Sequence, residues 1–67
     1  MTLCKLQEVF ECHTQIELLS LSEYHAGINP NRLFYVDYIP FEYEDVEIEI
    51  IKVVYANRLL VLTHQNL

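Results

Sequence analysis

The stretch Asp37-Tyr38-Ile39-Pro40-Phe41-Glu42-Tyr43-Glu44-Asp45-Val46-Glu47-Ile48-Glu49 carries signals for a strand end, a turn and a new strand in direct succession. Pro40 lacks an amide donor, so it ends any strand that precedes it. Residues 41–45 then fit a short turn or one helical turn. From Val46, apolar residues alternate with Glu47 and Glu49, which is the pattern of a half-buried strand. We therefore expect two strands joined by a tight connection.

The same stretch holds all of the net charge of the chain. Six of the ten acids lie in it, and no Lys or Arg occurs between Arg32 and Lys52. The chain has a formal net charge of −6, and the stretch alone contributes −6. The remaining four acids are matched in number by the four bases, which are Lys5, Arg32, Lys52 and Arg58. Such an uneven distribution favours contact with a basic partner, and it disfavours direct contact with nucleic acid or an anionic membrane.

The length and composition indicate one small folded domain, residues 1–67. A hydrophobic fraction of 52% argues against intrinsic disorder. The hydrophobic core of so short a chain gives only weak stability, which favours self-association as an additional source of stability. Cys4 and Cys12 are eight residues apart in a predicted helix, about 12 Å at 1.5 Å per residue, which is too far for a disulfide. Free thiols, no signal peptide and no membrane-length apolar run predict a soluble protein of a reducing cytoplasm.

Before and after the acidic stretch, the sequence predicts one helix and three strands. The spacing of Leu3, Leu6, Val9 and Phe10 predicts an amphipathic helix over residues 3–11. Residues 16–21 form an apolar run of strand length, and residues 22–31, which contain Gly27, form the longest loop. Residues 32–38 alternate as a half-buried strand. A break in phase at Ile50-Ile51 indicates a bulge or a strand that leaves the core. Ala56-Asn57 is a two-residue hairpin loop before a last strand, 59–63.

These elements predict an α+β fold in which one N-terminal helix packs on a four-stranded antiparallel sheet, arranged as a meander. A single short helix covers only one face of such a sheet. The other face would leave apolar and aromatic residues for self-association into a homodimer; these are Tyr35, Ile51, Val53 and Tyr55.

Catalytic and metal-binding patterns are weak in this sequence. The three histidines are His13, His25 and His64, and no C-x-x-C or H-x-x-x-H spacing is present. Cys12 or Ser22 could meet His25 only through the fold, and the chain has a single glycine for an oxyanion turn. We therefore expect a non-enzymatic protein without a cofactor or metal.

The acidic stretch has two interpretations. Alternating glutamates can be no more than the solvated face of a strand. A surface that serves solubility alone, however, normally mixes both signs of charge, and here Tyr38, Phe41 and Tyr43 lie among the acids. Aromatic residues between charges are typical of protein interfaces. The predicted partner-binding residues are Asp37, Tyr38, Glu42, Tyr43, Glu44, Asp45, Glu47 and Glu49.

Several short motifs resemble those of a broad group of small acidic proteins encoded by phages and mobile elements of low-GC Gram-positive bacteria. The motifs are Met1-Thr2-Leu3 with Leu6 and Glu8-Val9-Phe10, Thr14-Gln15-Ile16-Glu17-Leu18, Tyr35-Val36-Asp37-Tyr38-Ile39-Pro40, and Val46 before a two-strand ending. The resemblance implies a host-directed inhibitor that acts by binding, such as an anti-CRISPR protein that occupies a basic DNA-binding surface of a CRISPR effector nuclease. It also leaves open a DNA-mimic inhibitor of a uracil-DNA glycosylase or restriction enzyme. A third possibility is a self-associating accessory module whose acids serve only solubility.

Overall fold

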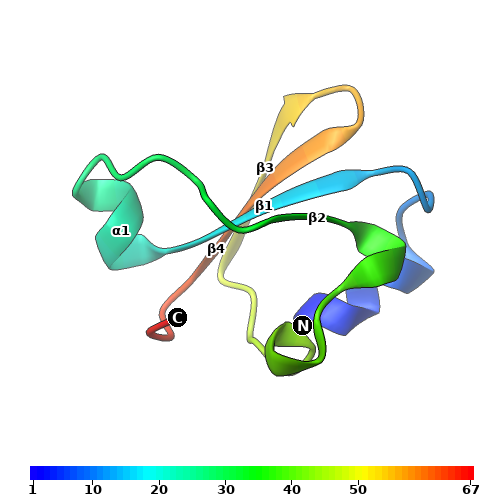
Figure 1. The fold of residues 1–67 in the computed structure, drawn as a ribbon, viewed down its shortest axis with the longest axis horizontal. Helices are drawn as coiled ribbons and strands as arrows, with labels where there is room; N and C mark the ends of the chain where they lie inside the picture. The colour runs from blue at the N-terminus through cyan, green and yellow to red at the C-terminus, as the bar shows by residue number, and fades with distance from the viewer.

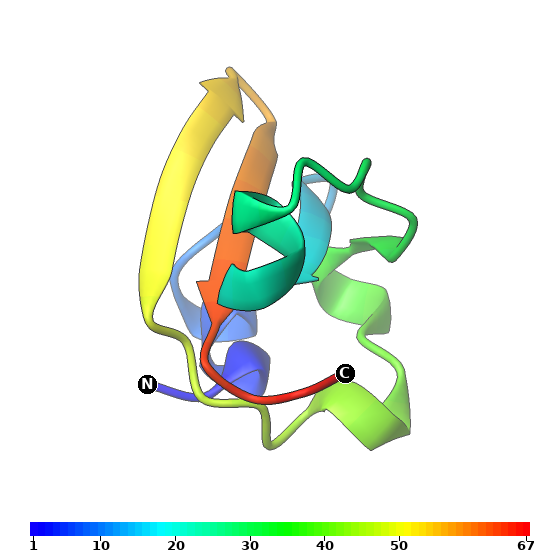
Figure 2. The ribbon, with the colours of Figure 1, turned by 90° about the vertical axis from the view of Figure 1, so that its left-hand side faces the viewer.

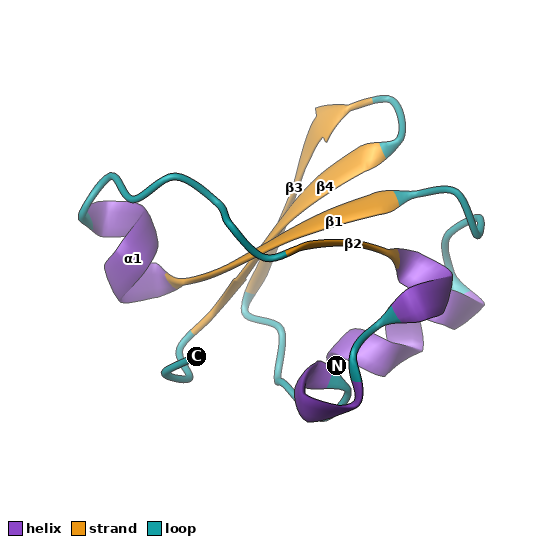
Figure 3. Cartoon of the chain, viewed as in Figure 1, coloured by secondary structure: helices purple, strands orange, loops and turns teal.

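The two most buried strands form the centre of a single four-stranded sheet (Figures 1 and 3). In the computed structural model, which describes residues 1–67, β1 (Gln15–Ser20) pairs in parallel with β4 (Arg58–Thr63). β2 (Leu33–Tyr35) pairs antiparallel with β1, and β3 (Ile50–Tyr55) pairs antiparallel with β4. The strand order is therefore β2-β1-β4-β3, and β2 and β3 form the two edges.

The predicted antiparallel meander is wrong. A meander needs β2 beside β3, whereas β1 and β4 separate them and pair in parallel. Parallel pairing needs a long crossover, and here residues 21–57 provide it, including α1 (Leu21–His25), β2 and β3. The end of the strand predicted over residues 32–38 is instead a 3₁₀ turn, η2 (Val36–Tyr38). The turn predicted over residues 41–45 contains a second 3₁₀ turn, η3 (Phe41–Tyr43).

The predicted N-terminal α-helix is also replaced by a shorter element. η1 (Leu3–Glu8) is a 3₁₀ helix of six residues, with Leu3 and Leu6 buried. The first residues of the chain are held by backbone hydrogen bonds to the acidic stretch: the Leu3 amide donates to the Val46 carbonyl at 2.8 Å and the Cys4 amide donates to the Glu44 carbonyl at 3.1 Å. Val46 and its neighbours therefore pair with the N-terminal segment rather than extending β3.

Residues at the start of the predicted long loop form α1, whose two ends are defined by side-chain and backbone hydrogen bonds. Ser20 and Glu23 form a capping box at its start. At its end the Gly27 amide donates to the Tyr24 carbonyl and the Ile28 amide to the Glu23 carbonyl, at 3.1 Å each. Gly27 has a φ of 75°, so this is a Schellman ending with glycine in the left-handed region.

The hydrophobic core lies on one face of the sheet, beneath η1, η2 and the 36–49 segment (Figure 2). Its fully or nearly buried members are Leu3, Leu6, Ile16, Leu18, Val36, Ile39, Val46, Leu59 and Val61. The opposite face is contacted at one end by α1, which packs on β1 and β4. We call this opposite face the open face.

Two predictions about the C-terminal half can be compared with the structure. The Ala56-Asn57 hairpin is confirmed, because it joins β3 to β4. There is no bulge at Ile50-Ile51, since the register shift lies between Val53 and Tyr55. The alternative prediction, a strand that leaves the core, is confirmed, because five of the six residues of β3 are exposed. None of the helices has the length and apolar character needed to cross a membrane.

Candidate protein-binding surface

Buried apolar residues fix the backbone of the acidic stretch at regular intervals. Val36, Ile39 and Val46 are at most 7% exposed and belong to the core. Tyr43 stacks on Phe34 with ring centroids 6.0 Å apart and an angle of 15° between the ring planes. Tyr43, which was predicted to contact a partner, is half-buried against the core. The stretch is thus anchored, although it contains no regular strand.

Between these anchors, charged and aromatic side chains face the solvent. Tyr38 is 76% exposed and Phe41 is 87% exposed. Asp37, Glu42 and Asp45 are also exposed. The most exposed large apolar residue, Phe41, is absent from the predicted partner-binding set, although its position between Pro40 and Glu42 was visible in the sequence. We call the following group the acidic-aromatic surface: Asp37, Tyr38, Phe41, Glu42, half-buried Glu44, and Asp45.

The geometry of η3 brings two of these carboxylates to one side. Glu42 lies in η3 and Asp45 three residues later, with the intervening Glu44 still helical at φ −57° and ψ −38°. Residues three apart on a 3₁₀ turn eclipse one another at about 6 Å along the axis. This spacing is shorter than the roughly 6.7 Å that separates alternate residues of a strand, which is the arrangement predicted for Glu47 and Glu49.

The acids of this surface have no cationic partner within the chain. Lys5, Arg32 and Arg58 form ion pairs with Glu8, Glu23 and Glu17, which all lie outside the acidic stretch. Lys52 donates instead to the Tyr24 hydroxyl at 2.9 Å. Asp37, Glu42, Glu44 and Asp45 therefore carry four negative charges without an intramolecular ion pair.

Glu47 and Glu49, which complete the predicted acidic set, differ from these four. The Glu47 carboxylate lies 3.3 Å from the N-terminal ammonium, and the Glu49 carboxylate lies 3.5 Å from the His64 ring. Both residues lie between η3 and β3, after the two 3₁₀ turns. The structure therefore separates the predicted acidic set into an unpaired group, Glu47 beside the N-terminal ammonium, and Glu49 beside the His64 ring.

The predicted self-association residues do not share one face. Ile51 and Val53 pair with Val61 and Leu59, respectively, so they point to the core side of the sheet; Ile51 packs against the core and Val53 is 72% exposed at the sheet edge. Tyr35 and Tyr55 are 46% and 63% exposed and lie on the open face.

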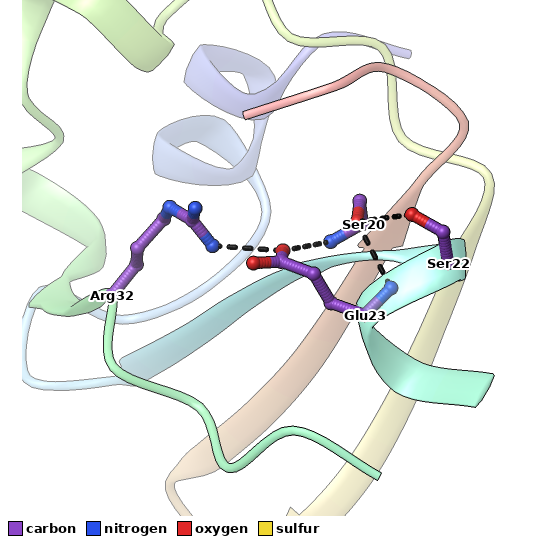
Figure 4. Close-up of polar contacts among 4 residues, drawn as sticks. All are labelled: Ser20, Ser22, Glu23 and Arg32. Carbon is purple, nitrogen blue, oxygen red and sulfur yellow. Dashed lines mark hydrogen bonds and ion pairs between the residues drawn. The ribbon is translucent and has the colours of Figure 1, made fainter. Parts of the chain in front are cut away.

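A polar network links α1 to the residue before β2 (Figure 4). One Glu23 carboxylate oxygen accepts from the Ser20 amide and from the Arg32 guanidinium, each at 2.9 Å, while the Ser20 hydroxyl accepts from the Glu23 amide at 3.2 Å. The Ser20 amide and then Arg32 hold the pKa of Glu23 below its ordinary value. Glu23 in turn raises the pKa of Arg32. The carboxylate with which Arg32 pairs is therefore that of Glu23, which lies outside the acidic stretch.

Groups suited to chemistry do not converge in this fold. The surface has no pocket, and no three His, Cys, Asp or Glu side chains are grouped so that they could hold a metal ion. The nearest partners of His13 and His64 are single glutamates, and both cysteines are free. No known protein family, curated protein or solved structure matches this chain.

Proposed function

We propose that this chain is a non-enzymatic inhibitor from a phage or mobile element, acting in the bacterial cytoplasm. In this proposal the acidic-aromatic surface binds a basic DNA-binding surface of a CRISPR effector nuclease. The observation that carries it is the presence of four carboxylates without an intramolecular ion pair around Tyr38 and Phe41, which are 76% and 87% exposed.

The chemistry of this surface suits a partner rich in arginine. Carboxylates bind guanidinium groups through short, charge-assisted hydrogen bonds. Exposed Tyr and Phe side chains can supply the apolar contact area that dominates binding energy at the centre of an interface. A DNA-binding channel offers this combination, because its cationic groups are arranged to meet phosphates. Binding would be accelerated by electrostatic attraction and weakened by salt.

The choice of target rests on the resemblance of the sequence to small acidic phage proteins. Anti-CRISPR proteins are one class among them, and inhibitors of uracil-DNA glycosylases or restriction enzymes are another. The close placement of Glu42 and Asp45 on one side of a 3₁₀ turn fits any protein that recognises a row of phosphates. The nuclease is therefore the first target to test.

The test measures DNA cleavage by a purified, guide-loaded CRISPR effector nuclease in the presence of this protein. The variant Glu42→Gln/Asp45→Asn removes two unpaired charges from the acidic-aromatic surface. We expect it to bind about tenfold more weakly, which corresponds to about 1.4 kcal/mol. A second variant, Phe41→Ser, should weaken binding without altering its dependence on salt, because it removes apolar contact but no charge.

The matched control is Glu8→Gln/Glu11→Gln, which also removes two exposed acids but leaves the acidic-aromatic surface intact. It should inhibit as the unmodified protein does. Equal weakening by both double variants would point to net charge alone and would contradict a specific surface. Absence of binding to the nuclease would reject that target, and inhibition of a uracil-DNA glycosylase or restriction enzyme by the same surface would identify the alternative.

A further inference from the structure

The open face carries an aromatic and polar row that crosses all four strands. In register, Tyr35 of β2 lies beside Gln15 of β1, Gln15 beside Arg58 of β4, and Arg58 beside Tyr55 of β3. Adjacent strands are about 4.8 Å apart, so the two tyrosines are about 14 Å apart at the ends of the row. This row was not visible in the sequence, because β1 and β4 are more than 40 residues apart and were not expected to pair.

The polar centre of the row is already satisfied within the chain. The Arg58 guanidinium donates to the Gln15 side-chain oxygen from Nε at 3.0 Å and from Nη2 at 2.7 Å, and to Glu17 from Nη1 at 3.3 Å. It also lies 5.6 Å from the centre of the Tyr55 ring. A charge that is paired and hydrogen-bonded in this way can be covered by another molecule at lower cost than an isolated charge.

Apolar side chains surround this centre and remain accessible. Tyr35, Tyr55 and Leu33 are 46%, 63% and 57% exposed. α1 contacts β1 and β4 at the opposite end of the face, where Lys52 lies 4.8 Å from the centre of the Tyr24 ring. The central and outer parts of the open face therefore lack a cover.

We propose that the open face binds the open face of a second copy of this chain, forming a two-fold dimer of stacked sheets. A two-fold axis parallel to β1 and β4, between the two faces, places Tyr35 of each copy opposite Tyr55 of the other. It also places Gln15 opposite Arg58, so the row matches itself, as an isologous interface requires. Stacked sheets pack about 10 Å apart, which suits interleaved tyrosine rings.

The open face carries little of the charge of the chain, so a second copy can approach it. Its charged side chains are Glu17, Lys52 and Arg58, which sum to +1, whereas the whole chain carries −6. The unpaired carboxylates belong to the segment that covers the other face, so the dimer keeps them apart, and at physiological salt the Debye length is only about 8 Å. Burial of the open face also adds to a core of only eleven buried hydrophobic residues.

Sedimentation velocity from about 10 μM to about 1 mM, a range that covers weak affinities, tests the dimer. The unmodified protein should change from monomer to dimer within it. Tyr35→Lys and Tyr55→Glu should each raise the dissociation constant at least about tenfold, whereas the combined Tyr35→Lys/Tyr55→Glu variant should restore dimerisation, because opposite charges then meet across the two-fold axis. Circular dichroism and thermal unfolding verify that each variant folds.

Tyr38→Glu is the matched control, since Tyr38 is similarly exposed but lies on the acidic-aromatic surface. It should leave the dimer unchanged. A monomer at every concentration would overturn the proposal. So would a dimer that survives both tyrosine substitutions but dissociates with Val53→Glu, because that result would place the contact at the edge of β3.

Discussion

Glu23 is stabilised in its ionised form by the Ser20 amide and the Arg32 guanidinium, which lowers its pKa from the ordinary value of 4.5. A lowered pKa stabilises the folded protein above the ordinary pKa, and this contribution is lost as the pH falls through the lowered value. Glu23→Gln keeps a side chain that can form the capping box but removes the charge. The variant should therefore be less stable than the unmodified protein near neutral pH, and the difference should shrink below pH 4.5.

Thermal unfolding between about pH 3 and pH 7 measures this difference. Glu8→Gln is the control, because Glu8 and its partner Lys5 are 69% and 60% exposed in their side chains, and such pairs contribute little. A difference between Glu23→Gln and the unmodified protein that stays constant across the pH range would contradict the role of the Glu23 charge.

The sequence indicates one part of this network, the capping box, but not the ion pair with Arg32. Ser20 and Glu23 have the spacing of a capping box, which indicates a helix start where a loop was expected. The partner Arg32 lies nine residues further on, and only the folded turn after α1 brings it close. A local motif of four residues can therefore be read from the sequence, whereas the ion pair between Glu23 and Arg32 depends on the fold.

α1 has only five residues, so its ends matter more than its interior. Gly27 adopts a φ of 75°, and no atom lies within 4 Å of the position that a Cβ would occupy. Gly27→Ala should therefore destabilise the protein by about 1 kcal/mol through backbone strain alone. Gly27→Asn should destabilise it less, because asparagine tolerates the left-handed region. Denaturant unfolding compares the two, and equal stability of Gly27→Ala and the unmodified protein would contradict the Schellman ending.

In the C-terminal half, the strand patterns of the sequence predict the hairpin from Ile50 to Thr63 but not the pairing of the residues before it. Its loop, Ala56-Asn57, was predicted because two apolar runs flank it closely. The predicted strand from Val46 is wrong. Val46 alternates with glutamates as in a strand, but its carbonyl accepts a hydrogen bond from Leu3, near the N-terminus. Alternation therefore reported correctly that Val46 is buried and Glu47 exposed, but not which segment lies beside them.

The strand order of the whole molecule could not be obtained from these patterns. Short connections favour an antiparallel meander, and nothing within a single strand indicates that β1 and β4 pair in parallel. The acidic stretch was identified as the centre of net charge from the sequence alone. Its division into unpaired acids and two acids with a neighbouring group depends on the positions of the N-terminal ammonium and His64, which only the complete fold determines.

The uneven charge of the whole molecule should make its stability rise with salt. Two unit charges about 6 Å apart repel by about 0.7 kcal/mol in water, and Asp37, Glu42, Glu44 and Asp45 have no cation to offset this repulsion. The Debye length falls from about 30 Å at 0.01 M salt to about 8 Å at 0.15 M. The melting temperature should therefore increase over this range, by roughly 4 °C or more for each kcal/mol of repulsion removed.

The variant Glu42→Gln/Asp45→Asn separates this effect from a general response to salt. At low salt it should melt at a higher temperature than the unmodified protein, and the advantage should largely vanish at 0.15 M, a concentration at which exposed charges are screened. Glu8→Gln removes an acid that already has Lys5 as its partner, so it should not reproduce the gain. If the double variant were instead less stable at low salt, the four acids would be offset within the folded chain, and both the repulsion and the surface proposed for binding would lose their physical basis.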